Sequence, residues 1–166
     1  MKQHLISLVL FFSFLLSGCM PLKQTEVTSP NGHIRLAFAL DGNNRMTYQV
    51  SVGDTVFITP SLLGFTAKDG VNLAEGFKVV NTGFTTHDET WTQPWGENKN
   101  IRNHYNEMAV HLSDTTNTKL TLRFRIFDDG LGFRYEYEVP GADSILVTDE
   151  LTAFNIAQDG TSWSIP

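Results

Sequence analysis

The segment HIRLAFALDGNNRMTYQVSV, residues 33–52, carries the clearest structural signal in the chain. Every second residue from Ile34 to Leu40 is apolar, and the same alternation returns from Met46 to Val52. The sequence DGNN between them, residues 41–44, has the composition of a tight turn. Two alternating runs around a short turn predict an antiparallel β-hairpin with one apolar face.

The chain after Val27 continues as short β-strand candidates separated by turns. We expect strands at residues 55–58, 62–66, 77–84, 108–112, 120–127, 132–139, 145–149 and 154–156, with 108–112 paired to 120–127. Turn residues lie at 69–70, 128–130 and 140–141. No segment shows a helical period with caps. This pattern predicts one all-β domain over residues 27–166, built as an antiparallel β-sandwich.

The alternation fails between Phe84 and Met108, where we expect a loop of about twenty residues, longer than loops usually run without a function. The sequence ETWTQPWGENKNIRNHYNE, residues 89–107, holds two of the three tryptophans. Aromatic faces and planar carboxylate, amide and guanidinium groups are what proteins use to hold sugars. The candidates for carbohydrate binding or for an interface are Trp91, Trp95, Glu97, Arg102, Asn103, His104, Tyr105, Asn106 and Glu107. An alternative is that the tryptophans plug one end of the sandwich while the polar groups bond to each other.

Metal and catalytic sites have weaker support in the sequence. His87-Asp88-Glu89, and His104 with Glu107, could supply ligands, but the chain contains no His-x-x-x-His motif and no acidic calcium loop. We therefore expect no metal bound by this chain alone. Glu89, Glu97 and Glu107 could include an acid/base pair of a glycosidase, which needs two carboxylates about 5–10 Å apart, and spacing in the sequence cannot place them. We assign no catalytic residue.

Residues 1–18 have the composition of a signal peptide. Lys2 precedes an apolar or small run from Leu5 to Leu16, which is too short for a bilayer core that needs about 20 residues. The sequence Leu-Ser-Gly-Cys ending at Cys19 resembles a bacterial lipobox, which implies cleavage before Cys19 and lipidation of that residue. An ordinary secretory signal with an incidental cysteine is the alternative. Residues 19–26 then form a tether, and we expect a periplasmic domain that is lipid-anchored to the bacterial membrane, with surface exposure less favoured.

The charge pattern argues against a nucleic-acid-binding protein, and the cysteine count excludes a protein stabilised by disulfides within the chain. The formal net charge is −6, and no two of the 12 Lys and Arg residues are adjacent. Nucleic-acid binding depends on clustered cations, so we do not expect a nucleic-acid partner. Cys19 is the only cysteine, and no disulfide can form within the chain. Stability must then come from a hydrophobic core, which a chain of this length can build.

Several short motifs in order resemble one family of enzymes. The resemblance is to the amino-terminal domain of glycoside hydrolase family 97, which includes SusB-like α-glucosidases and α-galactosidases. It covers nearly all of the chain after the tether. The motifs are SPNG (29–32), PSLLG (60–64), DETW (88–91), WGE (95–97), IRNHYNE (101–107), FDDGLGFRY (127–135), TDEL (148–151) and WSIP (163–166).

The resemblance implies an architecture as well as an activity. Family members combine an amino-terminal β-super-sandwich, similar to galactose mutarotase, with a central (β/α)8 barrel and a small carboxy-terminal β-domain. They hydrolyse α-linked glucosides or galactosides, with calcium near the active site and the catalytic carboxylates on the barrel. The sandwich packs against the barrel and lends residues to the site. This implies that residues 27–166 form a partial domain, truncated before the barrel and catalytically silent alone, with an α-linked oligosaccharide and the barrel as partners.

Two questions stay open at the level of sequence. The WGE and NHYNE motifs match the family pattern, and they could either touch sugar or brace the interface between sandwich and barrel. The chain could also be a free-standing carbohydrate-binding lipoprotein or the remnant of a truncated gene. The first would bind oligosaccharides as a soluble monomer. The second would fold poorly, because a sandwich that lacks strands exposes edges that aggregate.

Overall fold

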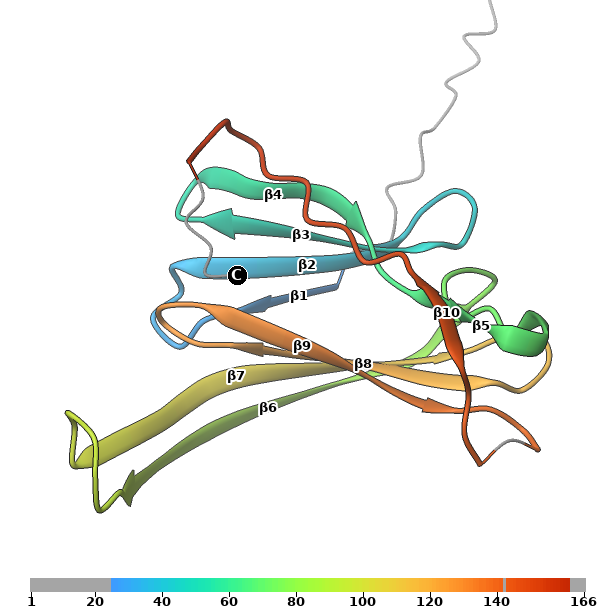
Figure 1. The fold of residues 1–166 in the computed structure, drawn as a ribbon. Coiled ribbons are helices and arrows are strands. Elements are labelled where there is room, and N and C mark those ends of the chain that lie inside the picture. Colours follow the sequence, from blue (N-terminus) through green and yellow to red (C-terminus); the bar gives the residue numbers. More distant parts are fainter. Residues whose placement is uncertain (1–24, 142, 162–166) are drawn as a thin grey trace, which may run out of the picture.

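The computed structural model describes residues 25–141 and 143–161 (Figure 1). This part of the chain contains ten strands and one short 3-10 turn, η1 (Lys68–Gly70), which confirms the predicted all-β class. Its strands are β1 (Thr25–Thr28), β2 (Ile34–Leu40), β3 (Met46–Val52), β4 (Thr55–Leu62), β5 (Phe65–Ala67), β6 (Lys78–Thr92), β7 (Asn100–Ser113), β8 (Lys119–Ile126), β9 (Leu131–Glu138) and β10 (Val147–Glu150).

Some of the sequence predictions fall outside the described residues. They are the signal peptide at 1–18, the lipidation site Cys19, most of the tether, and the motif at 163–166. Within the described ranges, no helix is long and apolar enough to cross a membrane.

The predicted hairpin forms the centre of the first sheet, whose strand order is β1-β2-β3-β4. β2 and β3 pair antiparallel from Ile34↔Val52 to Leu40↔Met46. Asn44 adopts a positive φ of 57° in the turn, a conformation that Asn tolerates better than most residues. The alternating apolar residues Leu36 and Phe38 are fully buried, as the period of two requires.

The second sheet has the order β6-β7-β8-β9, and all its neighbours are antiparallel. The predicted pairing of residues 108–112 with 120–127 is confirmed, since Met108 lies opposite Phe124 and Leu112 opposite Leu120. Figure 1 shows this sheet packed across the first one, as in a β-sandwich. β5 and β10 form a separate two-stranded sheet at one end.

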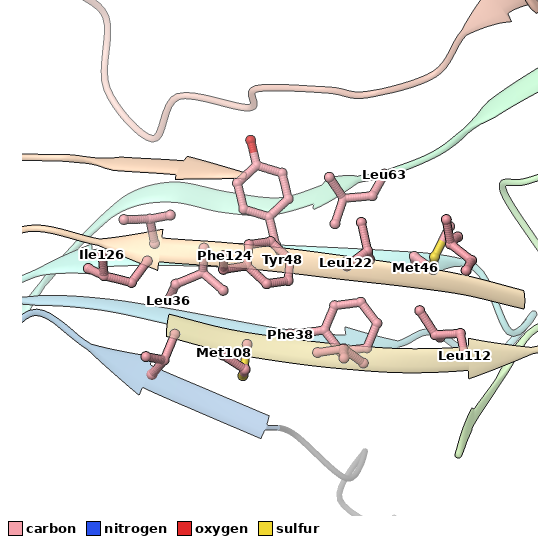
Figure 2. Close-up of a cluster of buried hydrophobic side chains, with 14 of the residues drawn as sticks. Leu36, Phe38, Met46, Tyr48, Leu63, Met108, Leu112, Leu122, Phe124 and Ile126 are labelled. Atoms are coloured by element: carbon pink, nitrogen blue, oxygen red, sulfur yellow. The ribbon is translucent and has the colours of Figure 1, made fainter. Parts of the chain in front are cut away.

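The core lies between the two four-stranded sheets (Figure 2). Figure 2 draws its side chains meeting between strands of both sheets. Burying one such Leu, Phe or Met side chain stabilises the fold by about 1.5–3 kcal/mol. The labelled members from the first sheet and from Leu63 just after it are Leu36, Phe38, Met46, Tyr48 and Leu63, and those from the second sheet are Met108, Leu112, Leu122, Phe124 and Ile126.

Residues 151–157, which we call the strap, contain the segment 154–156 that the sequence predicted to be a strand. The strap runs along the free edge of β4 without forming a strand, and only one isolated bridge joins Ile58 to Ile156. Backbone bonds from Thr59 N to Asn155 O and from Ala153 N to Leu62 O hold it, each 2.9 Å long. The sequence pattern was wrong about the strand because a three-residue apolar run does not specify regular pairing.

The predicted loop between Phe84 and Met108 is also wrong. Those residues form the greater part of a long antiparallel hairpin, in which β6 and β7 pair from Lys78↔Ser113 to Thr92↔Asn100. Most side chains of β6 are exposed. A strand with no buried face needs no hydrophobic alternation, which is the signal that the prediction relied on. A smaller difference is that β4 runs through Pro60 as one strand.

Candidate functional site

Residues 85–107, which we call the distal hairpin, extend past the end of the sandwich (Figure 1). The tip between the strands is held by the backbone bond from Gln93 N to Lys99 O, at 3.0 Å, and by Gln93 Nε2 donating to Asn98 O at 2.9 Å. Trp95 lies in this tip with 81% of its surface exposed. Residues opposite each other in an antiparallel pair share a face, so the register assigns each remaining candidate to one side of the hairpin.

The outer face, which points away from the core, begins at Glu107. Its neighbour Met108 is fully buried in the core, and successive side chains alternate. Glu107 is nevertheless only 7% exposed, because two arginines of β8 cover it. Arg123 Nη1 and Arg125 Nε donate to its two carboxylate oxygens at 2.5 and 2.7 Å. Burial alone raises the pKa of Glu107, but the hydrogen bonds from the two arginines outweigh it and hold the pKa below its ordinary value.

Tyr105 follows Glu107 on the outer face and is 7% exposed. Its ring stacks on His87 with centroids 5.0 Å apart and packs at 5.2 Å against Phe127. The guanidinium of Arg125 sits 4.6 Å from the ring centroid, within the range of a cation–π contact. Three different strands or turns therefore immobilise this ring, which leaves little of it free to contact a ligand.

The outer face continues through a polar cluster to Trp91. His87 Nε2 lies 3.1 Å from Glu89 Oε1, and Asn103 Nδ2 donates to the same oxygen at 3.2 Å. The hydrogen bond from His87 is the main reason that the pKa of Glu89 falls below its ordinary value. Trp91, directly opposite Ile101, keeps 48% of its surface exposed. This end of the face combines an accessible aromatic ring with a carboxylate and an amide.

The inner face of the distal hairpin carries the other polar candidates. Arg102 Nε and Nη2 donate to the two oxygens of Asp88 at 2.8 and 2.7 Å, a bidentate pair that lowers the pKa of Asp88. Asn106 Nδ2 donates to the carbonyl of Thr28 in β1 at 2.9 Å and so ties the hairpin to the first sheet. The Nδ1 atom of His104 is buried without a hydrogen-bond partner among the described residues.

The nine predicted residues therefore do not converge on one pocket. Trp91, Asn103, Tyr105 and Glu107 belong to the outer face, Arg102, His104 and Asn106 to the inner face, and Trp95 and Glu97 to the tip. The idea that the tryptophans plug the sandwich is wrong, because both are largely exposed. The same alternative also expected the polar groups to bond to each other, and this is correct for several of them.

The same division limits what the glutamates and histidines could do. Glu107 is committed to two arginines, and His104 lies on the opposite face, so these two cannot ligate one ion. Among residues 25–141 and 143–161, no three His, Cys, Asp or Glu side chains gather as a metal site would require. The calcium expected for the full-length enzyme stays a prediction.

Sequence reasoning missed the arginines that cover Glu107. Arg123 and Arg125 come from β8, and the register places Arg125 directly opposite Glu107. The signal was present in the sequence of β8, KLTLRFRI, in which apolar residues alternate with polar ones. It could not be used without knowing that residues 105–107 belong to the neighbouring strand.

Comparison with known proteins places the chain in a family. The sequence profile described as Glycosyl-hydrolase 97 N-terminal matches residues 27–166. A retaining alpha-galactosidase of Bacteroides thetaiotaomicron is 26% identical over 144 residues, which make up 87% of this chain and 20% of that protein.

Solved structures give the same result. A glycoside hydrolase family 97 enzyme from Pseudoalteromonas sp. strain K8, solved in complex with panose and with acarbose, superposes with a TM-score of 0.75 at 30% identity. The match covers 80% of this chain and 20% of that one. A beta-arabinopyranosidase structure has a TM-score of 0.73 at 25% identity over 80% of this chain and 21% of its own. The chain therefore spans about a fifth of the length of these relatives. It belongs to glycoside hydrolase family 97, and the part matched is the amino-terminal domain of that family.

Proposed function

We propose that this domain is part of an α-glycosidase that hydrolyses α-linked glucosides or galactosides, and that its distal hairpin contributes to the sugar-binding side of that enzyme. The family supports the hydrolase class, and the names of the relatives support the substrates, since one is an alpha-galactosidase and another was solved with panose and acarbose. The domain itself supplies binding and packing, and the cleavage of the glycosidic bond belongs to the rest of the enzyme.

The observation that carries this proposal is the exposure of two tryptophans on a braced hairpin. Trp95 is 81% and Trp91 48% exposed, although burial of a tryptophan is strongly favoured. The strands below them are fixed by the Asp88–Arg102 pair and by the stacked ring of Tyr105. Aromatic rings carried by a hairpin whose strands are held in place require less ordering of the backbone on binding a flat, hydroxyl-rich ligand.

The experiment is a kinetic comparison in the complete enzyme that contains this domain. Trp95→Ala should raise KM for α-linked oligosaccharides about tenfold, equivalent to about 1.4 kcal/mol of lost contact, and change kcat little. Phe57→Ala is the matched control, because Phe57 is also exposed, at 53%, but lies on β4 in the other sheet. An unchanged KM in Trp95→Ala, or the same change in both variants, would show that the tip does not contact substrate.

A free-standing carbohydrate-binding lipoprotein is the alternative, and the comparisons lend it no support. It requires saturable binding of oligosaccharide by this chain alone. Titration with maltooligosaccharides, followed by tryptophan fluorescence, measures this directly. A saturable change would favour the alternative, and its absence would remove it.

We further propose that the domain is held at the bacterial membrane through Cys19 and faces the periplasm. The support is the Leu-Ser-Gly-Cys sequence after an apolar run. Metabolic labelling with radioactive palmitate should mark the wild-type protein and leave Cys19→Ala unlabelled. Equal labelling of both forms, or no labelling of either, would contradict lipid attachment at this residue.

A further inference from the structure

The turn SPNG, residues 29–32, lies between β1 and β2 and contains the only Asn-Gly sequence of the chain. Gly32 adopts a φ of +73° there, a left-handed conformation that favours glycine. Both Asn31 and Gly32 are exposed to solvent. A glycine has no side chain to hinder its own backbone nitrogen, so the turn requires the very residue that makes the preceding asparagine chemically vulnerable.

The vulnerability is deamidation, a reaction that contributes to the thermal lability of asparagine. The backbone nitrogen of Gly32 attacks Cγ of Asn31 and forms a C–N bond. The proton of that nitrogen passes through solvent to the side-chain amino group, which leaves as ammonia. Water then opens the resulting cyclic succinimide at either carbonyl. One opening gives aspartate, and the other gives isoaspartate, in which the backbone runs through the former side chain.

The folded turn engages both of the reacting groups. The N–H of Gly32 donates to the carbonyl of Ser29 at 2.8 Å, which opposes the loss of its proton. The Oδ1 atom of Asn31 accepts bonds from Ser29 Oγ at 2.6 Å and from the backbone N–H of His33 at 2.9 Å. These bonds fix the orientation of the side-chain amide. The turn must therefore open before the nitrogen of Gly32 can attack.

Ser29 holds more of this turn than any other residue in it. It is only 1% exposed, and its hydroxyl both donates to Asn31 Oδ1 and accepts the N–H of Ile34 at 2.9 Å. Its backbone carbonyl accepts the N–H of Gly32, and its own N–H donates to the carbonyl of Ile34, each at 2.8 Å. Without the hydroxyl, the N–H of Ile34 would lose its side-chain partner, and buried groups left in this way are costly.

We propose that Asn31 is a site of spontaneous deamidation, and that the buried hydroxyl of Ser29 keeps the reaction slow while the domain is folded. A group that reacts only from a locally opened state reacts in proportion to the population of that state. The rate at Asn31 therefore reports how often the turn between β1 and β2 opens. The proposal does not depend on the sugar-binding role of the distal hairpin.

The two products should differ in their effect on the fold. Aspartate keeps the Oδ1 acceptor, and it keeps the backbone N–H that donates to Asp128 Oδ1 at 2.9 Å. Isoaspartate lengthens the backbone and displaces that N–H from Asp128. Figure 1 shows the turn between β8 and β9, which carries Asp128, beside the turn between β1 and β2. Isoaspartate should therefore weaken a contact between the two sheets, whereas aspartate should preserve it.

Incubation of the complete protein at neutral pH, followed by peptide mass spectrometry, tests the proposal. The free peptide VTSPNGHIR, residues 27–35, sets the rate without a folded turn. Wild-type Asn31 should convert at least roughly tenfold more slowly than the peptide, because only the opened fraction reacts. Ser29→Ala should raise the rate in the protein about tenfold, equivalent to about 1.4 kcal/mol of lost turn stability. Conversion of the wild type at the rate of the peptide, or an unchanged rate in Ser29→Ala, would overturn the proposal.

Ser61→Ala is the matched control. Ser61 is also buried, and its hydroxyl also makes two bonds, to the carbonyl of Thr59 and from the N–H of Asn155. Its loss should leave the rate at Asn31 unchanged. Equal acceleration in both variants would contradict a local role of Ser29 and indicate a general loss of stability instead. The comparison of the wild type with the peptide stands by itself if Ser29→Ala does not fold.

Discussion

Glu107 illustrates how a carboxylate can be buried on the outside of a sheet. The long side chains of Arg123 and Arg125 lie over it, and their charges offset the cost of removing it from water. Arg123 is itself shared with Glu136, which also pairs with Arg134. Such a network stabilises the face only while each member is present, because one missing partner leaves another charge poorly compensated.

We therefore predict that Glu107→Gln lowers the free energy of unfolding by about 2 kcal/mol, since the two arginines lose their shared anion. Glu138→Gln is the control. Glu138 meets Lys119 at 3.4 Å with 74% of its side chain exposed, and such a surface pair contributes less than about 0.5 kcal/mol. Urea unfolding of both variants measures the difference, and equal losses would mean that the network adds nothing beyond ordinary surface charge.

Glu136 makes the stability depend on pH in acid. Hydrogen bonds from Arg123 and Arg134 lower its pKa from 4.5 to about 2, against the smaller effect of burial. Between these values the unfolded chain binds more protons than the folded one, so the free energy of unfolding falls as the pH is lowered from about 5 to about 2. Because 36% of the side chain is exposed, we expect this group to account for about 1 kcal/mol of the fall. Glu136→Gln should flatten the pH profile in this window, and an unchanged profile would contradict the assignment.

Gly64 is required by its backbone and by its surroundings. It has a φ of +128°, and a Cβ atom there would lie 2.5 Å from the Cα of Ala74. We predict that Gly64→Ala destabilises the protein by more than about 3 kcal/mol, because the backbone of Leu73 and Ala74 would have to move away from the added methyl group. Gly130→Ala is the control, since nothing lies within 4 Å of its added Cβ, and its effect should stay within about 1 kcal/mol. Thermal unfolding distinguishes the two, and similar melting temperatures would contradict the prediction.

At the scale of elements, hydrophobic alternation located core strands such as β2, β3 and β8 and missed residues 85–107, the distal hairpin, most of whose β6 side chains are exposed. β2, β3 and β8 contribute one face to the core, so their sequences alternate as predicted. In the distal hairpin most side chains other than Tyr105 and Glu107 meet solvent or polar neighbours, and the pairing follows the continuing register of β6 and β7. Residue types for sugar recognition could be read from the sequence. Their division between two faces and a tip could not, because it requires the register.

The turns of the family motifs have a physical reason to occur together. The backbone N–H of Asn31, in the SPNG motif, donates to Oδ1 of Asp128, in the FDDG motif, at 2.9 Å. Ser29 Oγ and the side chain of Asn31 also organise the turn that leads into β2. These contacts join turns of the two facing sheets, which explains how motifs 97 residues apart support the same fold.

The strap shields the edge of β4, and the buried hydroxyl of Ser61 adds to the backbone bonds that hold it. Ser61 Oγ donates to the carbonyl of Thr59 and accepts the backbone N–H of Asn155 at 2.9 Å. Ser61→Ala should cost about 1 kcal/mol and speed amide exchange across residues 151–157. Thr47→Ala also removes one hydroxyl bond, to the carbonyl of Ala39, and should leave exchange in the strap unchanged. Faster exchange in neither variant would show that the backbone bonds and packing hold the strap without the Ser61 hydroxyl.

At the scale of the whole molecule, the edge strands β4 and β6 differ in whether other residues cover them. The strap covers β4, and Phe154 within it packs on Tyr48 and Phe133 across the mouth of the sandwich. The edge at β6 has no such cover among the described residues. The sandwich is therefore covered on the β4 side and open on the β6 side. This suits a domain that packs against other parts of a larger enzyme, and the chain covers only about 20% of the length of its relatives.

The size of the native polypeptide is the decisive prediction for the whole protein. We expect an immunoblot of source cells, with an antibody against this domain, to show a band far heavier than 18.6 kDa, because the chain covers only 20% of its family relatives and a barrel adds about 250 residues. The purified heavy species should cleave α-glucosides or α-galactosides, whereas the 166-residue chain should cleave neither. A band near 18.6 kDa would remove the hydrolase proposal for this protein.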